Sequence, residues 1–261
     1  PDWVLVYGDT NSTLAGALAA AKLHIPVAHV EAGLRSFNRR MPEEQNRIVT
    51  DHLADLLFTP TDTATARLRD EGIPEERICQ VGDVMYDAAL YYAERAAERS
   101  HVLARLGVAP GKYVLATVHR AENTDDPVRL QAIFEGLQDV ASELPVVLPL
   151  HPRTKKQLEL LDPRLVTRCS SRITVIDPVG YLDMVALESN AAVIATDSGG
   201  VQKEAYFHGV PCVTLREETE WVELVESGWN RLAPPGETAL GEAISASFGS
   251  RGMDVRPYGD G

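Results

Sequence analysis

Short apolar runs alternate with amphipathic segments along the whole chain. The first part predicts helices at 14–23, 42–54 and 61–71 between strands at 3–7, 25–30, 56–59 and 78–81. After residue 110 the alternation resumes, with strands predicted at 113–117, 146–149, 173–176, 192–196, 211–215 and 231–232. Continuous apolar runs of this length are typical of strands buried in parallel sheets. The pattern therefore predicts an α/β fold.

The longer gaps between strands divide these elements into two groups. A long helix is predicted at 86–106, directly after the Gly82–Met85 turn, which we interpret as a hinge. The helices predicted beyond it lie at 127–144, 155–161, 181–189, 200–208, 220–226 and from Thr238. Two α/β units joined by a hinge place a ligand-binding cleft at the carboxyl ends of their strands.

Composition narrows the class of partner. The 261 residues carry 25 basic and 38 acidic side chains, a net charge of −13, which disfavours nucleic acid and anionic membrane surfaces as partners. No run approaches 18 apolar residues, so no transmembrane helix is expected. Cys79, Cys169 and Cys212 show no zinc-site spacing, so no metal site is predicted. Cys79 and Cys212 lie in apolar runs and are expected in the core, in a reduced, cytoplasmic protein.

Carboxylates follow the first two predicted strands. Asp9 ends the first strand and Glu31 ends the second. Neighbouring strand ends bring such groups close together, and their repulsion can separate an acid from a base. A capping role for Asp9 is an equal alternative. Glu43 and Arg47 lie four residues apart on the next helix, which begins at Pro42.

A glycine-rich turn follows the strand at 192–196. The sequence TDSGGVQKE at 196–204 opens a helix, where backbone N–H groups favour a phosphate. Glu204 lies about one turn into the helix, where it could accept hydrogen bonds from ribose hydroxyls. The turn lacks the dinucleotide and P-loop spacings. Its alternative role is to tighten a strand–helix junction.

Two histidines stand at other strand ends. His119 follows the strand at 113–117, and His151 follows the strand at 146–149. Such residues can transfer protons or, when charged, hold a phosphate. Histidines in loops are more often simply solvated, so only the sheet edge favours a functional role here.

Five motifs together resemble the non-hydrolysing UDP-N-acetylglucosamine 2-epimerases, in order over nearly the whole chain. They are GDT at 8–10, HVEAGLR at 29–35, PEEQNR at 42–47, TDSGG at 196–200 with Gln202 and Glu204, and PYGDG at 257–261. The resemblance implies two Rossmann-like domains of the glycosyltransferase-B or glycogen-phosphorylase kind, with a cleft between them. They are expected at 1–84 and 85–248, and a segment at 249–261 starts back towards the first.

The resemblance also implies the activity. Members are isomerases that interconvert UDP-GlcNAc and UDP-ManNAc by eliminating and re-adding UDP through a 2-acetamidoglucal. They use no nicotinamide cofactor or metal, form homodimers and serve polysaccharide biosynthesis. Carried over, Asp9, Glu31 and Glu43 are the acid–base candidates, and which of them takes the C2 proton stays open. His119 is expected beside the sugar and diphosphate, and Arg47 is expected to support the carboxylates or the ligand.

The remaining carried-over residues concern the nucleotide. Ser198, Gly199 and Gly200 are expected to bind the diphosphate, and Glu204 the ribose. Met184 falls where the family packs against uracil.

The chain departs from the family pattern in three places. The family's opening strand, with its Gly-Thr-Arg-Pro-Glu turn, and the helix after the closing motif have no counterpart here. The first domain is therefore expected to have an incomplete sheet with an open edge, as in a fragment of a longer protein. The sequence EWVE at 220–223 resembles an archaeal-type branch, which puts bacterial allosteric control by UDP-GlcNAc in doubt.

Alternatives stay open at this point. A UDP-sugar glycosyltransferase of the same fold would explain the second unit but not the carboxylates of the first. A catalytically incomplete UDP-sugar-binding protein would suit the missing arginine turn. A hydrolysing epimerase is a nearer variant, and the sugar itself could be GlcNAc or a modified relative such as its uronic acid.

Overall fold

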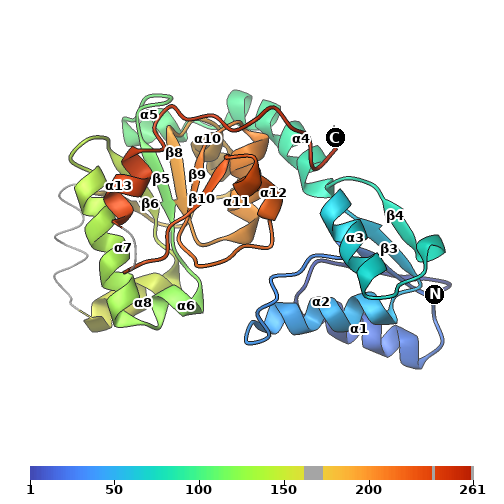
Figure 1. Ribbon diagram of the computed structural model, residues 1–261. Coiled ribbons are helices and arrows are strands. Elements are labelled where there is room, and N and C mark those ends of the chain that lie inside the picture. Colours follow the sequence, from blue (N-terminus) through green and yellow to red (C-terminus); the bar gives the residue numbers. More distant parts are fainter. Residues whose placement is uncertain (162–172, 237–238, 260–261) are drawn as a thin grey trace. The chain divides into compact units, whose positions relative to one another are not determined.

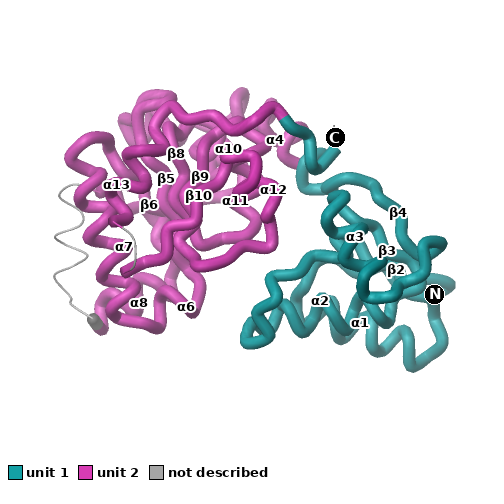
Figure 2. Tube along the Cα trace, viewed as in Figure 1, with its two compact units in different colours: residues 1–87, 255–261 teal, residues 88–254 magenta. Residues whose placement is uncertain are grey.

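The computed structural model describes residues 1–161, 173–236 and 239–259 and divides into two compact units (Figures 1 and 2). Unit 1 comprises Pro1–Asp87 with Val255–Gly261, and unit 2 comprises Ala88–Asp254. Cys169 and the predicted helix start at Thr238 lie outside the described residues. Each unit contains one parallel sheet, in keeping with the α/β prediction.

Unit 1 is a four-stranded sheet in the order β1-β2-β3-β4. Its elements are β1 (Val4–Tyr7), α1 (Asn11–Lys22), β2 (Val27–Val30), α2 (Pro42–Leu53), β3 (Leu56–Thr59), α3 (Asp62–Asp70), the 3-10 helix η1 (Glu75–Arg77) and β4 (Ile78–Gln80). Consecutive strands are neighbours and all pairs are parallel. Right-handed crossovers in this order place α1, α2 and α3 on the same face of the sheet.

The two faces of this sheet differ. Val6, Val27 and Leu57 face the helices and are buried. Leu5 and Tyr7 point to the opposite face, because side chains alternate along a strand, and are 49% and 58% exposed. Cys79 is exposed as well, so its predicted place in the core is wrong. Cys79 lies on β4, the edge strand of the sheet. In the register of the sheet it follows Tyr7, Val30 and Phe58 from strand to strand, so it points to the same face as Tyr7.

Unit 2 holds a six-stranded sheet in the order β10-β9-β8-β5-β6-β7. Its strands are β5 (Val114–Thr117), β6 (Val146–Pro149), β7 (Ile173–Ile176), β8 (Val193–Thr196), β9 (Cys212–Thr214) and β10 (Asn230–Leu232). The helices are α4 (Val84–Arg99), which starts in unit 1, α5 (Val102–Leu106), α6 (Ala121–Thr124), α7 (Pro127–Val140), α8 (Pro152–Leu161), α10 (Tyr181–Ser189), α11 (Gly199–Phe207), α12 (Val222–Glu226) and α13 (Leu240–Ser245).

Both faces of the unit 2 sheet are covered (Figure 1). Val114 and Ala116 pack with residues of α7, α8 and α13, whereas Leu115 and Ile194 pack with residues of α4, α5, α10 and α11. Adjacent positions on one strand therefore enter two different apolar layers. This accounts for the continuous apolar runs in the sequence.

The predicted helix at 86–106 is in fact two helices, α4 and α5. The interruption falls at Ser100 and His101. The Ser100 hydroxyl accepts a hydrogen bond from the Val102 N–H and donates one to Asp183, so it opens a new helix and ties it to α10. Helical periodicity continues through the break, which is why the sequence pattern concealed it.

The last described residues belong to unit 1. The Asp83 N–H donates to the Tyr258 carbonyl at 3.1 Å, and the Tyr258 side chain is buried. Gly82 has φ +79°, and a Cβ there would stand 2.8 Å from the Tyr258 carbonyl oxygen. The glycine thus permits the close approach of the returning segment to the turn before α4.

Candidate functional site

The carboxyl edge of the unit 1 sheet carries Asp9 and Glu31. Strands β1 and β2 are parallel neighbours with Tyr7 opposite Val30, so both carboxylates leave the sheet at the same edge. Glu31 has φ +75°, a conformation that non-glycine residues rarely adopt and that often marks functional positions. A Cβ on Gly8 would lie 3.5 Å from Glu31 Oε2. The Glu31 carboxylate therefore packs over the turn that carries Asp9.

Helix α2 brings a buried arginine to Asp9. Arg47 Nη1 lies 2.7 Å from Asp9 Oδ2, and Arg47 Nη2 lies 2.8 Å from Glu44 Oε2. Glu44 also accepts hydrogen bonds from the Ser36 and Phe37 N–H groups, which lowers its pKa although burial acts to raise it. Arg47 and Glu44 are buried, whereas Glu43 is half-buried. Arg47 therefore bridges one candidate catalytic carboxylate and one structural carboxylate.

A second buried charge network lies behind this edge, and the sequence analysis did not single it out. Asp51 on α2 is fully buried and accepts hydrogen bonds from His29 Nδ1, Gly33 N–H and Arg35 Nη1. Arg35 also donates from Nε and Nη2 to Glu71, at 2.7 and 2.8 Å. The signal that could have found it is the spacing of α2, because positions 44, 47 and 51 share one helix face.

In unit 2 the candidate residues meet where the strand order reverses. The first strand of this unit, β5, lies between β8 and β6, and ligands of open α/β sheets bind outside the carboxyl ends of strands at such a point. His119 follows β5 and Ser198 follows β8. Asp197 is fully buried between them and accepts hydrogen bonds from the His119 and Arg120 N–H groups and from Asn123 Nδ2. It holds the loop after β5 against the start of α11.

Ser198 caps α11, because its hydroxyl accepts a hydrogen bond from the Val201 N–H. Gly199 and Gly200 form the first turn of this helix. A Cβ on Gly199 would stand 3.5–3.8 Å from Trp221, Arg120 and Glu220 side-chain atoms. The turn is therefore a capped helix N-terminus close to an arginine, which suits an anion.

A cavity of about 210 Å³ opens at this edge of unit 2. It joins His119, Met184 and Ser198, three residues predicted separately from the sequence, with His151. The other lining residues are Thr117, Val118, Pro149, Pro178, Val179 and Val201. The lining is mainly apolar with a few polar groups, as is usual for small-molecule sites.

His119 is placed to change its charge when an anion arrives. Burial lowers its pKa, the charges of Arg120 and His151 lower it further, and Asp197 acts to raise it. The ring centroids of His119 and His151 are 5.7 Å apart. His119 is therefore neutral near pH 7 in the free protein, and a bound diphosphate would favour its protonation.

Glu204 lies on α11 and is almost completely buried. It accepts a hydrogen bond of 3.2 Å from the Tyr181 hydroxyl. Burial raises the pKa of Glu204, with Tyr181 and Lys203 acting in the opposite direction. Glu188, on α10, is buried with both carboxylate oxygens lacking a hydrogen-bond partner among the described residues. Burial and the charge of Glu204 raise the pKa of Glu188 well above its ordinary value.

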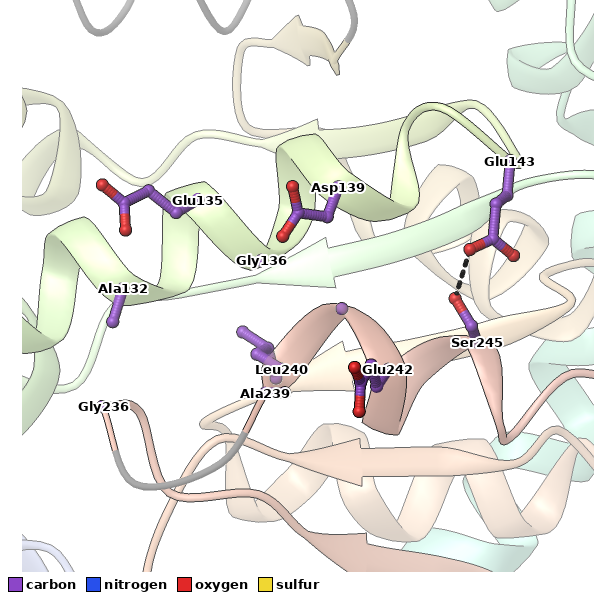
Figure 3. A pocket seen from close by; sticks show the side chains of 11 residues that line it. Ala132, Glu135, Gly136, Asp139, Glu143, Gly236, Ala239, Leu240, Glu242 and Ser245 are labelled. Atoms are coloured by element: carbon purple, nitrogen blue, oxygen red, sulfur yellow. Dashed lines mark hydrogen bonds between the residues drawn. The ribbon is translucent and has the colours of Figure 1, made fainter.

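A larger pocket lies elsewhere in unit 2 and contains none of the predicted site residues (Figure 3). It has a volume of about 390 Å³ between α7 and α13, and its lining includes Glu135, Asp139, Glu143 and Glu242. Glu143 accepts a hydrogen bond from Ser245 across it. Four carboxylates disfavour a diphosphate ligand, so this pocket is not the candidate site.

Within residues 1–161, 173–236 and 239–259, no three His, Cys, Asp or Glu side chains gather as ligands for a metal ion. Among the described helices, none has the length and apolar character that crossing a bilayer requires.

Comparison with known sequences identifies relatives over the full chain. A family profile described as UDP-N-acetylglucosamine 2-epimerase matches residues 1–261. The chain is 52% identical over 265 residues to UDP-2,3-diacetamido-2,3-dideoxy-D-glucuronate 2-epimerase of Pseudomonas aeruginosa, covering 100% of this chain and 72% of the relative. It is 45% identical over 265 residues to UDP-N-acetylglucosamine 2-epimerase of Methanocaldococcus jannaschii, with the same coverage.

Comparison with solved structures gives the same relationship. The structure of the Methanocaldococcus jannaschii UDP-GlcNAc 2-epimerase in complex with UDP-GlcNAc and UDP matches with a TM-score of 0.92, covering 100% of this chain and 72% of that chain. A Staphylococcus aureus MnaA–UDP structure matches with a TM-score of 0.86 at 33% identity, covering 100% and 70%. The expected glycosyltransferase-B-like fold is thereby confirmed.

Proposed function

Because the chain belongs to the UDP-N-acetylglucosamine 2-epimerase family, whose members are isomerases, we propose that it epimerises a UDP-sugar at C2. The observation that carries the assignment of roles is the pair of carboxylates, Asp9 and Glu31, at the ends of neighbouring parallel strands. Acid–base chemistry on a sugar requires such groups, and Arg47 holds one of them in place.

The proposed reaction has two steps. A carboxylate base takes the C2 proton, the electron pair of that C–H bond forms the C1–C2 double bond, and the C1–O bond breaks as UDP leaves with its electron pair. The resulting 2-acetamidoglucal is then attacked at C1 by a UDP oxygen while C2 receives a proton on the opposite face. Asp9, Glu31 and Glu43 are the candidates for these proton transfers.

Unit 2 supplies the groups proposed to hold UDP. Ser198, Gly199 and Gly200 at the start of α11 bind the diphosphate, with His119 donating a hydrogen bond and gaining charge. Met184 lines the cavity with them and packs against the uracil. Glu204 accepts hydrogen bonds from the ribose. A capped helix N-terminus beside a histidine supports this assignment.

Two sugars are candidates. UDP-GlcNAc is favoured by the 45%-identical archaeal relative and by the bound ligands of its structure. UDP-2,3-diacetamido-2,3-dideoxy-D-glucuronate is favoured by the name of the 52%-identical relative. A cytoplasmic location and a homodimeric assembly belong to the same proposal, and the assembly is tested by the mass of the particle in solution.

The decisive experiment is incubation of the chain with each sugar in deuterated water. We expect deuterium at C2 and formation of the C2 epimer. Glu31→Gln and Asp9→Asn should each lower the rate by roughly 10²- to 10⁴-fold, because each removes a proton-transfer group, while UDP affinity measured by calorimetry stays unchanged. Glu75→Gln is the matched control, since Glu75 is exposed and pairs with exposed Arg69.

Each other outcome selects a different function. Transfer of the sugar to an acceptor without an epimer would indicate a glycosyltransferase. Release of the free sugar epimer would indicate a hydrolysing epimerase. Binding of UDP with no turnover of either sugar would indicate a UDP-sugar-binding protein without catalytic activity.

A further inference from the structure

His29 is completely buried beneath the edge that carries the candidate carboxylates. Its Nδ1 lies 2.7 Å from Asp51 Oδ1, and its Nε2 lies 2.8 Å from the Gly8 carbonyl oxygen. A carbonyl can only accept a hydrogen bond, and so can an ionised carboxylate. A neutral imidazole has only one N–H and would leave one of these two contacts without a proton.

Asp51 is held in its ionised form by its other contacts. Its Oδ2 accepts hydrogen bonds from Arg35 Nη1 at 2.7 Å and from the Gly33 N–H at 3.1 Å. An arginine is always charged, and its guanidinium favours the ionised form of the carboxylate that accepts a hydrogen bond from it. Both ring nitrogens of His29 must therefore donate, and the ring is an imidazolium.

The groups that face His29 support its charge. Asp51 comes from α2, the Gly8 carbonyl from the end of β1, and Glu31 from the end of β2. Burial acts to lower the pKa of His29, but the hydrogen bond and charge of Asp51, the Gly8 carbonyl and the charge of Glu31 together raise it above 6.5. Arg35 lies on the far side of Asp51 and is itself paired with Glu71.

The contact with Gly8 ties this charge to the candidate catalytic groups. The Gly8 N–H donates to the Val30 carbonyl at 3.1 Å, and its own carbonyl accepts from His29. The next residue, Asp9, is held by Asn46 through its carbonyl and by Arg47 through its carboxylate. Among these contacts, the one from His29 depends on the protonation of an imidazole.

We propose that His29 is a buried imidazolium that positions Asp9 and Glu31, by fixing the Gly8 carbonyl and by placing a positive charge beneath the Glu31 carboxylate. His29 touches no substrate in this role, so it is a positioning residue. The functional part of the role rests on the proposed C2 epimerisation.

The protonation state is tested directly in the full chain by imidazole ¹⁵N spectroscopy. We expect both ring nitrogens of His29 to carry protons at pH 7. A neutral His29 ring with one bare nitrogen at pH 7 would overturn the proposal. The His29→Gln variant assigns the signal, and the measurement on the unaltered chain needs neither activity nor a folded variant.

The positioning role is tested with His29→Gln, which retains an N–H donor but no charge. We expect kcat for C2 deuterium exchange to fall roughly 10- to 100-fold with KM and UDP affinity unchanged, because misplacement of reacting groups affects the chemical step. We also expect the loss of kcat at high pH that accompanies deprotonation of His29 to disappear.

His52→Gln is the matched control, because His52 lies on α2, is 47% exposed and contacts Glu71. Unchanged kcat and an unchanged pH profile in folded His29→Gln would overturn the positioning role. If the unaltered chain exchanges no deuterium with either sugar, the proposed function fails, and the ¹⁵N measurement alone decides whether His29 is an imidazolium.

Discussion

The two units support their candidate site residues by different means. In unit 1 the residues behind Asp9 and Glu31 are buried and charged: Asp51 pairs with His29 and with Arg35, and Arg47 pairs with Asp9. In unit 2 apolar layers cover both faces of the sheet, Asp197 accepts hydrogen bonds from neutral N–H groups, and a buried ion pair, Arg216–Glu220, follows β9.

This difference predicts different sensitivities. A buried charge pair contributes little net stability, but breaking it leaves an uncompensated charge at a high cost. A neutral hydrogen bond in an apolar frame costs less to lose. The site edge of unit 1 should therefore respond more strongly to the loss of its buried carboxylate, Asp51, than the site edge of unit 2 does to the loss of Asp197.

The largest expected effect compares two buried aspartates. Asp51→Asn should destabilise unit 1 by about 3–5 kcal/mol, because His29 and Arg35 lose their counter-charge. Asp197→Asn should destabilise unit 2 by about 1–3 kcal/mol, because its donors are uncharged N–H groups. Hydrogen exchange followed by peptide mass spectrometry measures the two units separately. A larger loss for Asp197→Asn would contradict the comparison.

Substitution of one glycine at the site edge of each unit should also change stability by different amounts. Gly33 has φ +82°, and a Cβ there would stand 2.4 Å from the Ala64 carbonyl oxygen. Gly33→Ala should destabilise unit 1 by roughly 2–5 kcal/mol, from the backbone conformation and the clash together. In Gly199→Ala the nearest atoms are 3.5 Å away, so stability should change by less than about 1 kcal/mol.

The Gly199→Ala variant also tests the proposed diphosphate site. UDP affinity should fall in Gly199→Ala, whose fold is retained, because the added methyl group crowds the anion at the start of α11. Calorimetry with UDP measures this directly. Unchanged UDP affinity would show that the diphosphate does not approach Gly199.

The last expected effect is a gain in stability, opposite in sign to the others. The Glu188→Leu variant lacks a buried carboxyl group whose oxygens have no hydrogen-bond partner among the described residues. We expect it to stabilise unit 2 by about 1–3 kcal/mol. The raised pKa of Glu188 sets the pH dependence. The cost of burying Glu188 is smallest below about pH 4.5, where the carboxyl is protonated in both the folded and the unfolded state, and it grows as pH rises to the raised folded pKa.

The stabilisation by Glu188→Leu should therefore grow with pH between these limits. Thermal unfolding at several pH values measures it. Glu226→Leu at the exposed end of α12 is the control and should change stability by less than about 0.5 kcal/mol. A gain of the same size at every pH would show that Glu188 does not titrate in this range.

Much of the fold follows from local pattern. The strand at 56–59 and the start of α2 at Pro42 lie where the sequence predicts them, and the helix predicted at 61–71 is α3, which is one residue shorter at each end. The strands predicted at 146–149 and 173–176 also match, and the other strand boundaries differ by at most two residues. The 3-10 helix η1 and the short helix α6 were not predicted, because four or fewer residues carry no periodicity.

By itself, the sequence determined the α/β alternation, the strand ends that carry Asp9, Glu31, His119 and Ser198, and the family. These depend on neighbouring residues or on motifs read in order. Only the tertiary structure decided that His29 and Asp51 meet across 22 positions and that Cys79 is exposed. Hydrogen bonds between distant residues and the burial of a sheet face depend on which elements pack together, and no local spacing specifies that packing.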